Sequence, residues 1–161
     1  MPAKQPKIKT ERGAQGTRKL VSRLLAVQAV YEASQNGNIL DHVLQDYLNS
    51  RIGMEFDTHK IEEPDKDLFL KIARTVEKNY PEIVEILEAN IKTKEDTKSS
   101  GKKIEPLLRA VLLCGIGELL NHHDIDHPII INDYLEVTRA FYDKGEVSLV
   151  NAVLDSVAGL L

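Results

Sequence analysis

Three cations stand at the start of an apolar stretch, in the segment TRKLVSRLLAVQAVY that runs from Thr17 to Tyr31. A helix turns by about 100° per residue, so Arg18, Lys19 and Arg23 fall on one face beside small side chains, and large apolar residues occupy the other face. Guanidinium and ammonium groups are common protein partners of phosphate oxygens. The pattern favours a nucleic-acid contact, with an ordinary amphipathic helix whose long cations reach water as the alternative.

The basic character extends toward the N-terminus. The first 23 residues carry a net charge of +6, whereas the rest of the chain carries −10. A basic block on an acidic chain is typical of an arm that meets a polyanion. We therefore expect residues 1–16 to form a flexible basic arm, in which Lys9 and Arg12 extend the phosphate contact; a solvated tail is the alternative interpretation.

A second cluster that could carry chemistry is HHDIDH, from His122 to His127. Imidazole and carboxylate groups bind divalent metals, so a metal-dependent phosphohydrolase is one interpretation. The cluster directly precedes Pro128, however, in a polar connection where His and Asp serve as helix caps and dipole partners. We expect a connecting loop with no metal and no catalytic residue, and the phosphohydrolase is the minor alternative.

Composition sets further expectations. The length of 161 residues suits one domain, and the single cysteine, Cys114, lies in the apolar run LLRAVLLCGIGELL, which fits a buried thiol in a reducing compartment. The first residues lack the apolar core of a secretory signal, and the longest apolar run is too short to span a bilayer. We expect a soluble cytoplasmic protein with no membrane contact and no cofactor.

Helical periodicity dominates the chain, and no stretch alternates with the period of a strand. The sequence predicts an all-α fold, with about six helices in two antiparallel three-helix bundles that form a single domain, 17–161. The polar run KTKEDTKSSGKK is typical of a linker. The expected helices are 17–34, 39–50, 65–91, 105–121, 129–142 and 146–160, and the expected bundles are 17–91 and 104–161, joined by the linker 92–103.

Several local features refine these expectations. Thr17 and Asp65 are suited to cap the first and third helices. Pro81 lies inside the third helix, where the unbroken apolar periodicity predicts one long helix that bends rather than two. Gly115 and Gly117 interrupt an otherwise apolar helix, which indicates that a neighbouring helix packs closely there.

The C-terminal half contains three segments in a distinctive order, RAVLLCGIGELL, HPIIINDYLEV and FYDKGEVSLVNAVLDSV. Together with RLLAVQAVYEAS in the first predicted helix, they resemble the NusB family from about residue 17 onward. The positions expected to be structural parts of the family motifs are Glu118, Asn132, Asp133, Asn151 and Asp155.

The resemblance implies a NusB-like fold and a transcription antitermination factor that is not an enzyme. Members of that family bind single-stranded boxA RNA in ribosomal RNA leader transcripts together with NusE, a small ribosomal-subunit protein. They act on the RNA polymerase elongation complex with other Nus factors. Arg18, Lys19 and Arg23, with Lys9 and Arg12, would then contact the RNA.

The chain departs from the family pattern at one position that a packed core can absorb and in one basic run that matters more. Asp133 stands where the family usually has glutamate, and Leu20 and Val21 interrupt a run that often holds consecutive arginines. The thinner basic run predicts that RNA binding needs NusE.

A helical protein-interaction adaptor that does not bind RNA, or a homodimer, is the other class of function that the pattern leaves open.

Overall fold

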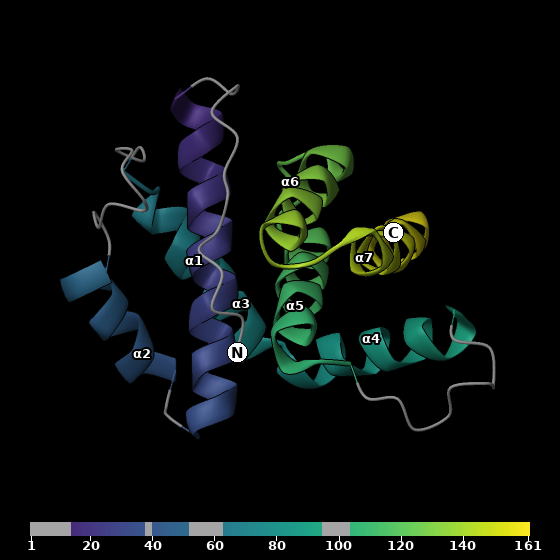
Figure 1. The fold of residues 1–161 in the computed structure, drawn as a ribbon, viewed down its shortest axis with the longest axis horizontal. Coiled ribbons are helices and arrows are strands. Elements are labelled where there is room, and N and C mark those ends of the chain that lie inside the picture. Colours follow the sequence, from purple (N-terminus) through teal and green to yellow (C-terminus); the bar gives the residue numbers. More distant parts are fainter. Residues whose placement is uncertain (1–13, 38–39, 52–62, 95–103) are drawn as a thin grey trace.

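The computed structural model describes residues 14–37, 40–51, 63–94 and 104–161, and these are helical with short connections (Figure 1). The predicted all-α class is confirmed, since the described residues contain helices and no strand. None of their helices is long and apolar enough to cross a membrane. The elements are α1 (Ala14–Asn36), α2 (Leu40–Asp46), the π-helix η1 (Tyr47–Arg51), α3 (Lys66–Lys78), α4 (Tyr80–Lys94), α5 (Pro106–Asn121), α6 (His127–Phe141) and α7 (Lys144–Gly159).

Helix α5 is the centre of the structure. It packs against α1, α3, α4, α6 and α7, and every residue from Ala110 to Leu119 is buried. A helix that is apolar on all sides is stable only when other helices surround it. The run LLRAVLLCGIGELL therefore becomes the shared core, with the Cys114 thiol completely buried as predicted.

Helix α1 is also surrounded, by α2, α3, α5 and α6. It stands beside α5 and α6 in Figure 1 and joins the N-terminal helices to the C-terminal ones. The helix begins at Ala14, earlier than predicted, so Thr17 is a buried residue inside the helix and not its cap. Its C-terminal end agrees with the sequence, because Gly37 follows with a φ of 64°, a left-handed conformation that glycine adopts without strain.

The segment predicted as one long bent helix is two helices. Helix α3 ends at Lys78, Asn79 caps it by bonding to the Thr75 carbonyl, and α4 begins at Tyr80 with Pro81 in its first turn. Proline is tolerated there because it has no N–H to place in the helical ladder. The change of direction lets α4 pack against α5 and α7, so α4 groups with the C-terminal helices rather than with those before it.

The remaining helix ends follow the sequence closely. The Asp65 side chain accepts a hydrogen bond from the Leu68 N–H at 3.1 Å, which confirms the predicted cap of α3. Pro106 and Pro128 stand in the first turns of α5 and α6, where proline is tolerated. The second helix is shorter than predicted, because its last turn is the π-helix η1. Helix α4 extends to Lys94, so it includes the first residues of the expected linker.

The two glycines of α5 mark close helix contacts, as predicted. A Cβ atom on Gly115 would lie 2.9 Å from Leu154 Cδ2 of α7, and one on Gly117 would lie 3.3 Å from Ile83 Cδ1 of α4. Both leucine and isoleucine side chains are fully buried. Glycine in α5 therefore sets how near α4 and α7 can approach.

A pair of Gly→Ala substitutions tests this packing. At Gly145, in the first turn of α7, an added Cβ meets nothing within 4 Å, so Gly145→Ala is expected to be neutral or to stabilise by up to about 1 kcal/mol through helix propensity. Gly115→Ala gains the same propensity but overpacks the core, which typically costs about 1–3 kcal/mol. Urea unfolding should rank Gly115→Ala below Gly145→Ala, and equal stability of the two variants would contradict the close approach.

Candidate nucleic-acid interface

The first turns of α1 present two of the predicted cations at the surface. Lys19 is exposed and Arg18 is half-buried. The Arg18 Nε donates a hydrogen bond to the Glu63 carbonyl oxygen at 2.8 Å, which ties α1 to the segment before α3. No carboxylate of the described residues forms an ion pair with Arg18 or Lys19. Both charges are therefore available to an external anion.

Arg23 does not lie on that surface, and its predicted place on an exposed cationic face is wrong. Only 1% of its surface is exposed. Its Nε donates to Glu118 Oε2 at 2.7 Å, its Nη2 donates to Glu118 Oε1 at 3.1 Å, and its Nη1 donates to Asp133 Oδ2 at 2.8 Å. The side chain links α1 to α5 and α6 inside the core.

Glu118 is the acceptor at the centre of this buried network. Beside the two bonds from Arg23, it accepts hydrogen bonds from the Tyr134 hydroxyl at 2.7 Å and from His122 Nδ1 at 2.8 Å. All of these residues are buried. A charge removed from water is stable only when it is paired and its remaining hydrogen-bonding capacity is used, and the network meets both conditions for Glu118.

The network shifts the ionisation of its members. Burial alone would raise the pKa of Glu118, but the hydrogen bonds from His122 and Arg23 and the Arg23 charge outweigh it, so the pKa lies below its ordinary value. Burial opposes the charge of Arg23, yet bonding to Glu118 raises its pKa further above neutrality. Burial and the Glu118 charge raise the pKa of Tyr134. The network therefore holds an ionised carboxylate and a neutral phenol at neutral pH.

The small residues next to Arg23 explain why it was predicted to be exposed although it is buried. Ser22, Ala26 and Ala29, which share the predicted cationic face, are fully buried. Small side chains on a helix permit close approach of another helix, so this face is a packing surface and not an opening for phosphate. Ser22 illustrates the contact, because its hydroxyl donates to the Asp65 carbonyl at 2.9 Å.

The signal for a buried arginine was present in the sequence. Glu118 is the one acid in the apolar run LLRAVLLCGIGELL, and a carboxylate that is buried in such a run is expected to pair with a cation. The sequence could not say which cation, because Arg23 lies 95 residues away along the chain. Leu20 and Val21, which interrupt the basic run, are core residues with 3% and 1% exposure. Lys9 and Arg12 lie outside the described residues.

The HHDIDH segment forms the connection between α5 and α6. His122 turns inward to Glu118, whereas His123, Asp124 and Asp126 are exposed. Asp126 precedes α6 without a side-chain capping bond, so the expected cap is wrong in that detail. No group of three or more His, Cys, Asp or Glu side chains in the described part of the chain is arranged to hold a metal ion.

The family-motif residues divide into two sets. Glu118 and Asp133 are buried and bind Arg23, so the shorter Asp133 side chain still reaches the guanidinium. Asn132, Asn151 and Asp155 are exposed on α6 and α7. A structural role for the buried pair follows from its contacts, whereas the role of the exposed three stays a prediction.

These features define a class of protein: an all-α chain in which a central helix and a buried arginine network join two groups of helices, with a basic helix start at the surface. The NusB family model matches residues 20–159. The transcription antitermination protein NusB of Agrobacterium fabrum is 32% identical over 157 residues, which cover 96% of this chain and 88% of that protein. The protein of the same name from Bartonella henselae is 29% identical over 153 residues, covering 95% of this chain and 90% of that protein.

The fold agrees with these relatives. The solved structure of T. maritima NusB superimposes with a TM-score of 0.64 at 19% identity, and the match covers 87% of this chain and 89% of that one. The chain belongs to the NusB family.

Removal of the Glu118 charge tests the buried network. Glu118→Gln keeps the shape of the side chain but leaves Arg23 with one anion, and breaking a buried ion pair costs about 3–5 kcal/mol. We expect a loss of that order in the free energy of unfolding measured with urea. Glu136→Gln is the matched control, because Glu136 pairs with Arg139 at the surface, where an ion pair contributes about 1 kcal/mol or less. Equal losses in the two variants would contradict a central role for Glu118.

The same carboxylate predicts a pH dependence. Because the folded protein lowers the pKa of Glu118, ionised Glu118 contributes stability that is fully present above its unfolded pKa, about 4.3, and is lost as the pH falls through the folded value. The free energy of unfolding should therefore decrease more steeply below about pH 4.3 in the wild type than in Glu118→Gln. Parallel pH profiles for the two proteins would contradict the assignment.

Proposed function

We propose that this chain is an RNA-binding transcription antitermination factor that acts on boxA-containing ribosomal RNA leader transcripts together with NusE. Its membership of the NusB family supports the proposal, as does the name of its relatives, transcription antitermination proteins. In this role it would join the RNA polymerase elongation complex with other Nus factors in the cytoplasm. The chain would supply binding surfaces and no catalytic group.

The RNA contact is assigned to Arg18 and Lys19, with Lys9 and Arg12 contributing from the preceding arm. The observation that carries this assignment is the difference between neighbouring cations of one helix. Arg23 is neutralised by buried carboxylates, whereas Arg18 and Lys19 have no ion-pair partner among the described residues. Unpaired cations at the surface of a chain with net charge −4 are the groups that a phosphate backbone would meet.

Arg23 has an indirect part in this proposal. It lies five residues from Arg18, about 7.5 Å along the helix axis at 1.5 Å per residue. By linking α1 to α5 and α6, it holds the outer end of α1 in place. Arg23 is a positioning residue in this scheme and does not touch RNA.

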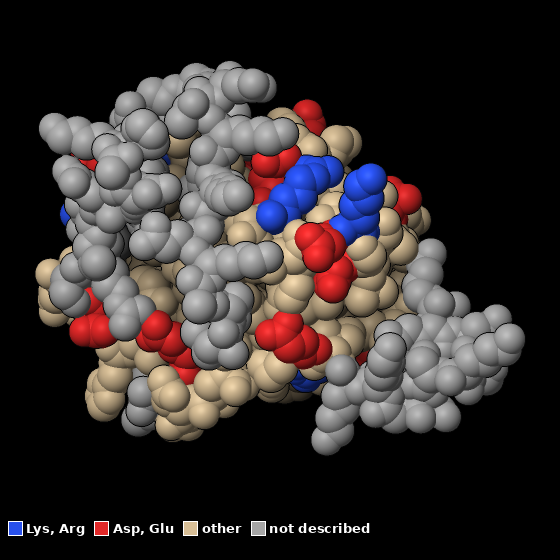
Figure 2. All heavy atoms as spheres, in the orientation of Figure 1, with Lys and Arg blue, Asp and Glu red and all other residues tan. Residues whose placement is uncertain are grey.

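The small number of cations in the proposed RNA contact supports the prediction that RNA binding needs NusE. Among the described residues, Arg18 and Lys19 are the cations assigned to this contact. On the face drawn in Figure 2, the Lys and Arg side chains that are in full view lie beside Asp and Glu. Two to four phosphate contacts supply modest affinity and no base selectivity. Selectivity for boxA would then arise on the joint surface with NusE.

Salt dependence of RNA binding tests the contact. If Lys9, Arg12, Arg18 and Lys19 neutralise four phosphates of a single strand, log K should fall with log salt with a slope of about −2.8. The double variant Arg18→Gln/Lys19→Gln should reduce the slope to about −1.4 and weaken binding at low salt. The measurement is fluorescence anisotropy of a labelled boxA oligonucleotide, with and without NusE.

The matched control is Arg139→Gln/Lys144→Gln, which removes the same charge from exposed positions on α6 and α7. It should leave the salt slope unchanged. Equal effects of the two double variants would assign the binding to net charge and reject the α1 contact. A protein that binds NusE but no RNA, with or without NusE, would instead be the interaction adaptor, and sedimentation would identify a homodimer.

A further inference from the structure

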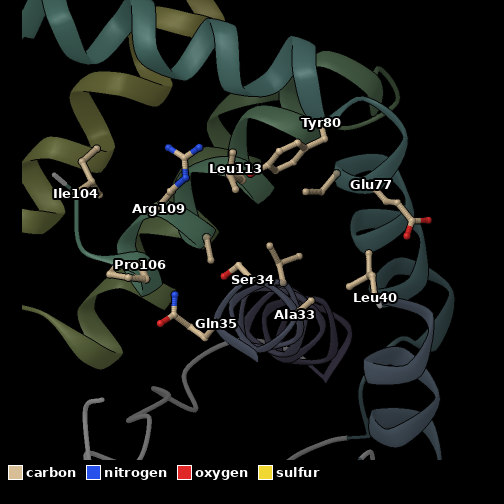
Figure 3. Close-up of a pocket in the computed structure, with 13 residues that line it drawn as sticks. Ala33, Ser34, Gln35, Leu40, Glu77, Tyr80, Ile104, Pro106, Arg109 and Leu113 are labelled. Carbon is tan, nitrogen blue, oxygen red and sulfur yellow. The ribbon is translucent and has the colours of Figure 1, made fainter. Parts of the chain in front are cut away.

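A groove lies at the opposite end of α1 from Arg18. Its volume is about 530 Å³, and it is bordered by the last turns of α1, the start of α2, the junction of α3 and α4, and the start of α5 (Figure 3). Ser34, in its wall, follows Arg18 by 16 residues, about 24 Å along the helix. The apolar walls include Val30, Ala33, Leu40, Val76, Ala110 and Leu113. The groove is therefore separate from the proposed RNA contact.

One cation in this groove has no counter-charge. Arg109 of α5 lines it, and no carboxylate of the described residues forms an ion pair with its guanidinium. The acid on the other wall, Glu77, lies 3.6 Å from Arg74 Nη1 on its own helix. Figure 3 shows the Glu77 carboxylate turned away from Arg109, at the far side of the groove. The groove thus combines apolar walls with a single uncompensated positive charge.

An exposed aromatic residue completes the site. Tyr80, at the start of α4, is 45% exposed, and its ring points toward Leu113 in Figure 3. Large apolar side chains with this exposure are few among the described residues. Tyrosine and arginine are enriched at the energetic centres of protein–protein interfaces, because each combines a large contact area with a directed polar group. Here they flank one apolar hollow.

We propose that this groove binds an amphipathic helix of a partner protein, with a carboxylate of that helix paired to Arg109. The partner helix would place apolar side chains spaced i, i+3 or i+4, and i+7 along the hollow, and an acidic side chain at its edge. Its apolar residues would fill the hollow, at whose floor Val76 and Leu113 lie nearly buried, and its backbone would pass beside Tyr80. The inference goes beyond RNA binding, because it assigns a second surface to a different class of partner.

The charge and shape of the groove favour this occupant. A nucleic acid would require several cations and would leave the apolar walls without a partner. A small-molecule site generally has several converging polar groups that fix the ligand, whereas Ser34 Oγ already donates to the Tyr31 carbonyl and Glu77 faces Arg74. A helix with one carboxylate beside an apolar face matches the groove, which has one unpaired arginine beside apolar walls.

A displayed library of helical peptides tests the proposal on the full chain. We expect selected peptides to share apolar residues at helical spacing and an acidic residue, and to perturb the NMR signals of Ala33, Val76 and Leu113. Arg109→Gln should weaken the selected peptides at least tenfold, since it removes a charge-assisted hydrogen bond of roughly 1.4 kcal/mol or more, whereas Arg109→Lys should retain part of the affinity. The control Arg139→Gln removes an exposed α6 arginine outside the groove and should change nothing.

A second variant makes the test independent of charge. Ala33→Trp fills the groove and should abolish peptide binding while leaving the circular dichroism and the salt-dependent RNA binding of the wild type. Peptides that bind Arg109→Gln and Ala33→Trp as well as they bind the wild type would overturn the proposal. Decanoate that binds with the same dependence on both variants, when no peptide does, would also overturn it and assign the groove to a small amphipathic anion. RNA binding by Arg18→Gln/Lys19→Gln is measured in a separate experiment. Failure of the proposed RNA contact can therefore be told apart from failure of the proposed peptide site.

Discussion

The position of α1 depends on one buried interaction, the pairing of Arg23 with Glu118 and Asp133. The guanidinium has five N–H donors in a fixed plane, and three of its bonds reach two helices that are distant in the sequence. An uncompensated charge in this core would cost several kcal/mol. The three side chains therefore specify which faces of α1, α5 and α6 meet. Tyr134 and His122 add to this specificity, because each donates to the same carboxylate from a different side.

This interaction separates the cations of α1 into two kinds. Arg23 is buried and paired with carboxylates, whereas Arg18 and Lys19 lie at the surface. The surface charge is smaller than the sequence indicates, which supports the proposal that RNA binding by this chain needs a partner.

Helix α5 provides the second constraint. Because it is apolar on nearly all sides, five helices surround it, and the glycines at 115 and 117 allow α4 and α7 to approach. Its first turns lie at the edge of this packing, where Arg109 is half-buried and the groove opens beside α1, α3 and α4. The two proposed binding surfaces thus lie near opposite ends of α1, so RNA and a protein helix need not compete for one site.

Local chemistry made most of the fold predictable from the sequence. Helical periodicity and the Asp65 cap act within a few residues, so the all-α class and the start of α3 were predicted correctly. The family resemblance likewise rested on the order of motifs along the chain. The break at Asn79 was not predicted, because the apolar spacing continues across it. Both α3 and α4 pack against α5, but α3 also packs against α1 and α4 against α7.

Only the tertiary structure decided which polar residues are buried. The sequence by itself determined an all-α chain with a basic helix start, and it marked Glu118 as a structural position of the family motifs. It placed Arg23 outside, since a helical projection counts Ser22, Ala26 and Ala29 as part of a polar face, whereas small residues also form the closest helix contacts. Arg23, the partner of Glu118, lies 95 residues away along the chain. The two side chains can form an ion pair in place of their contacts with water only after folding has brought α1 and α5 together. The groove beside Arg109 likewise exists only because five helices, α1 to α5, meet there.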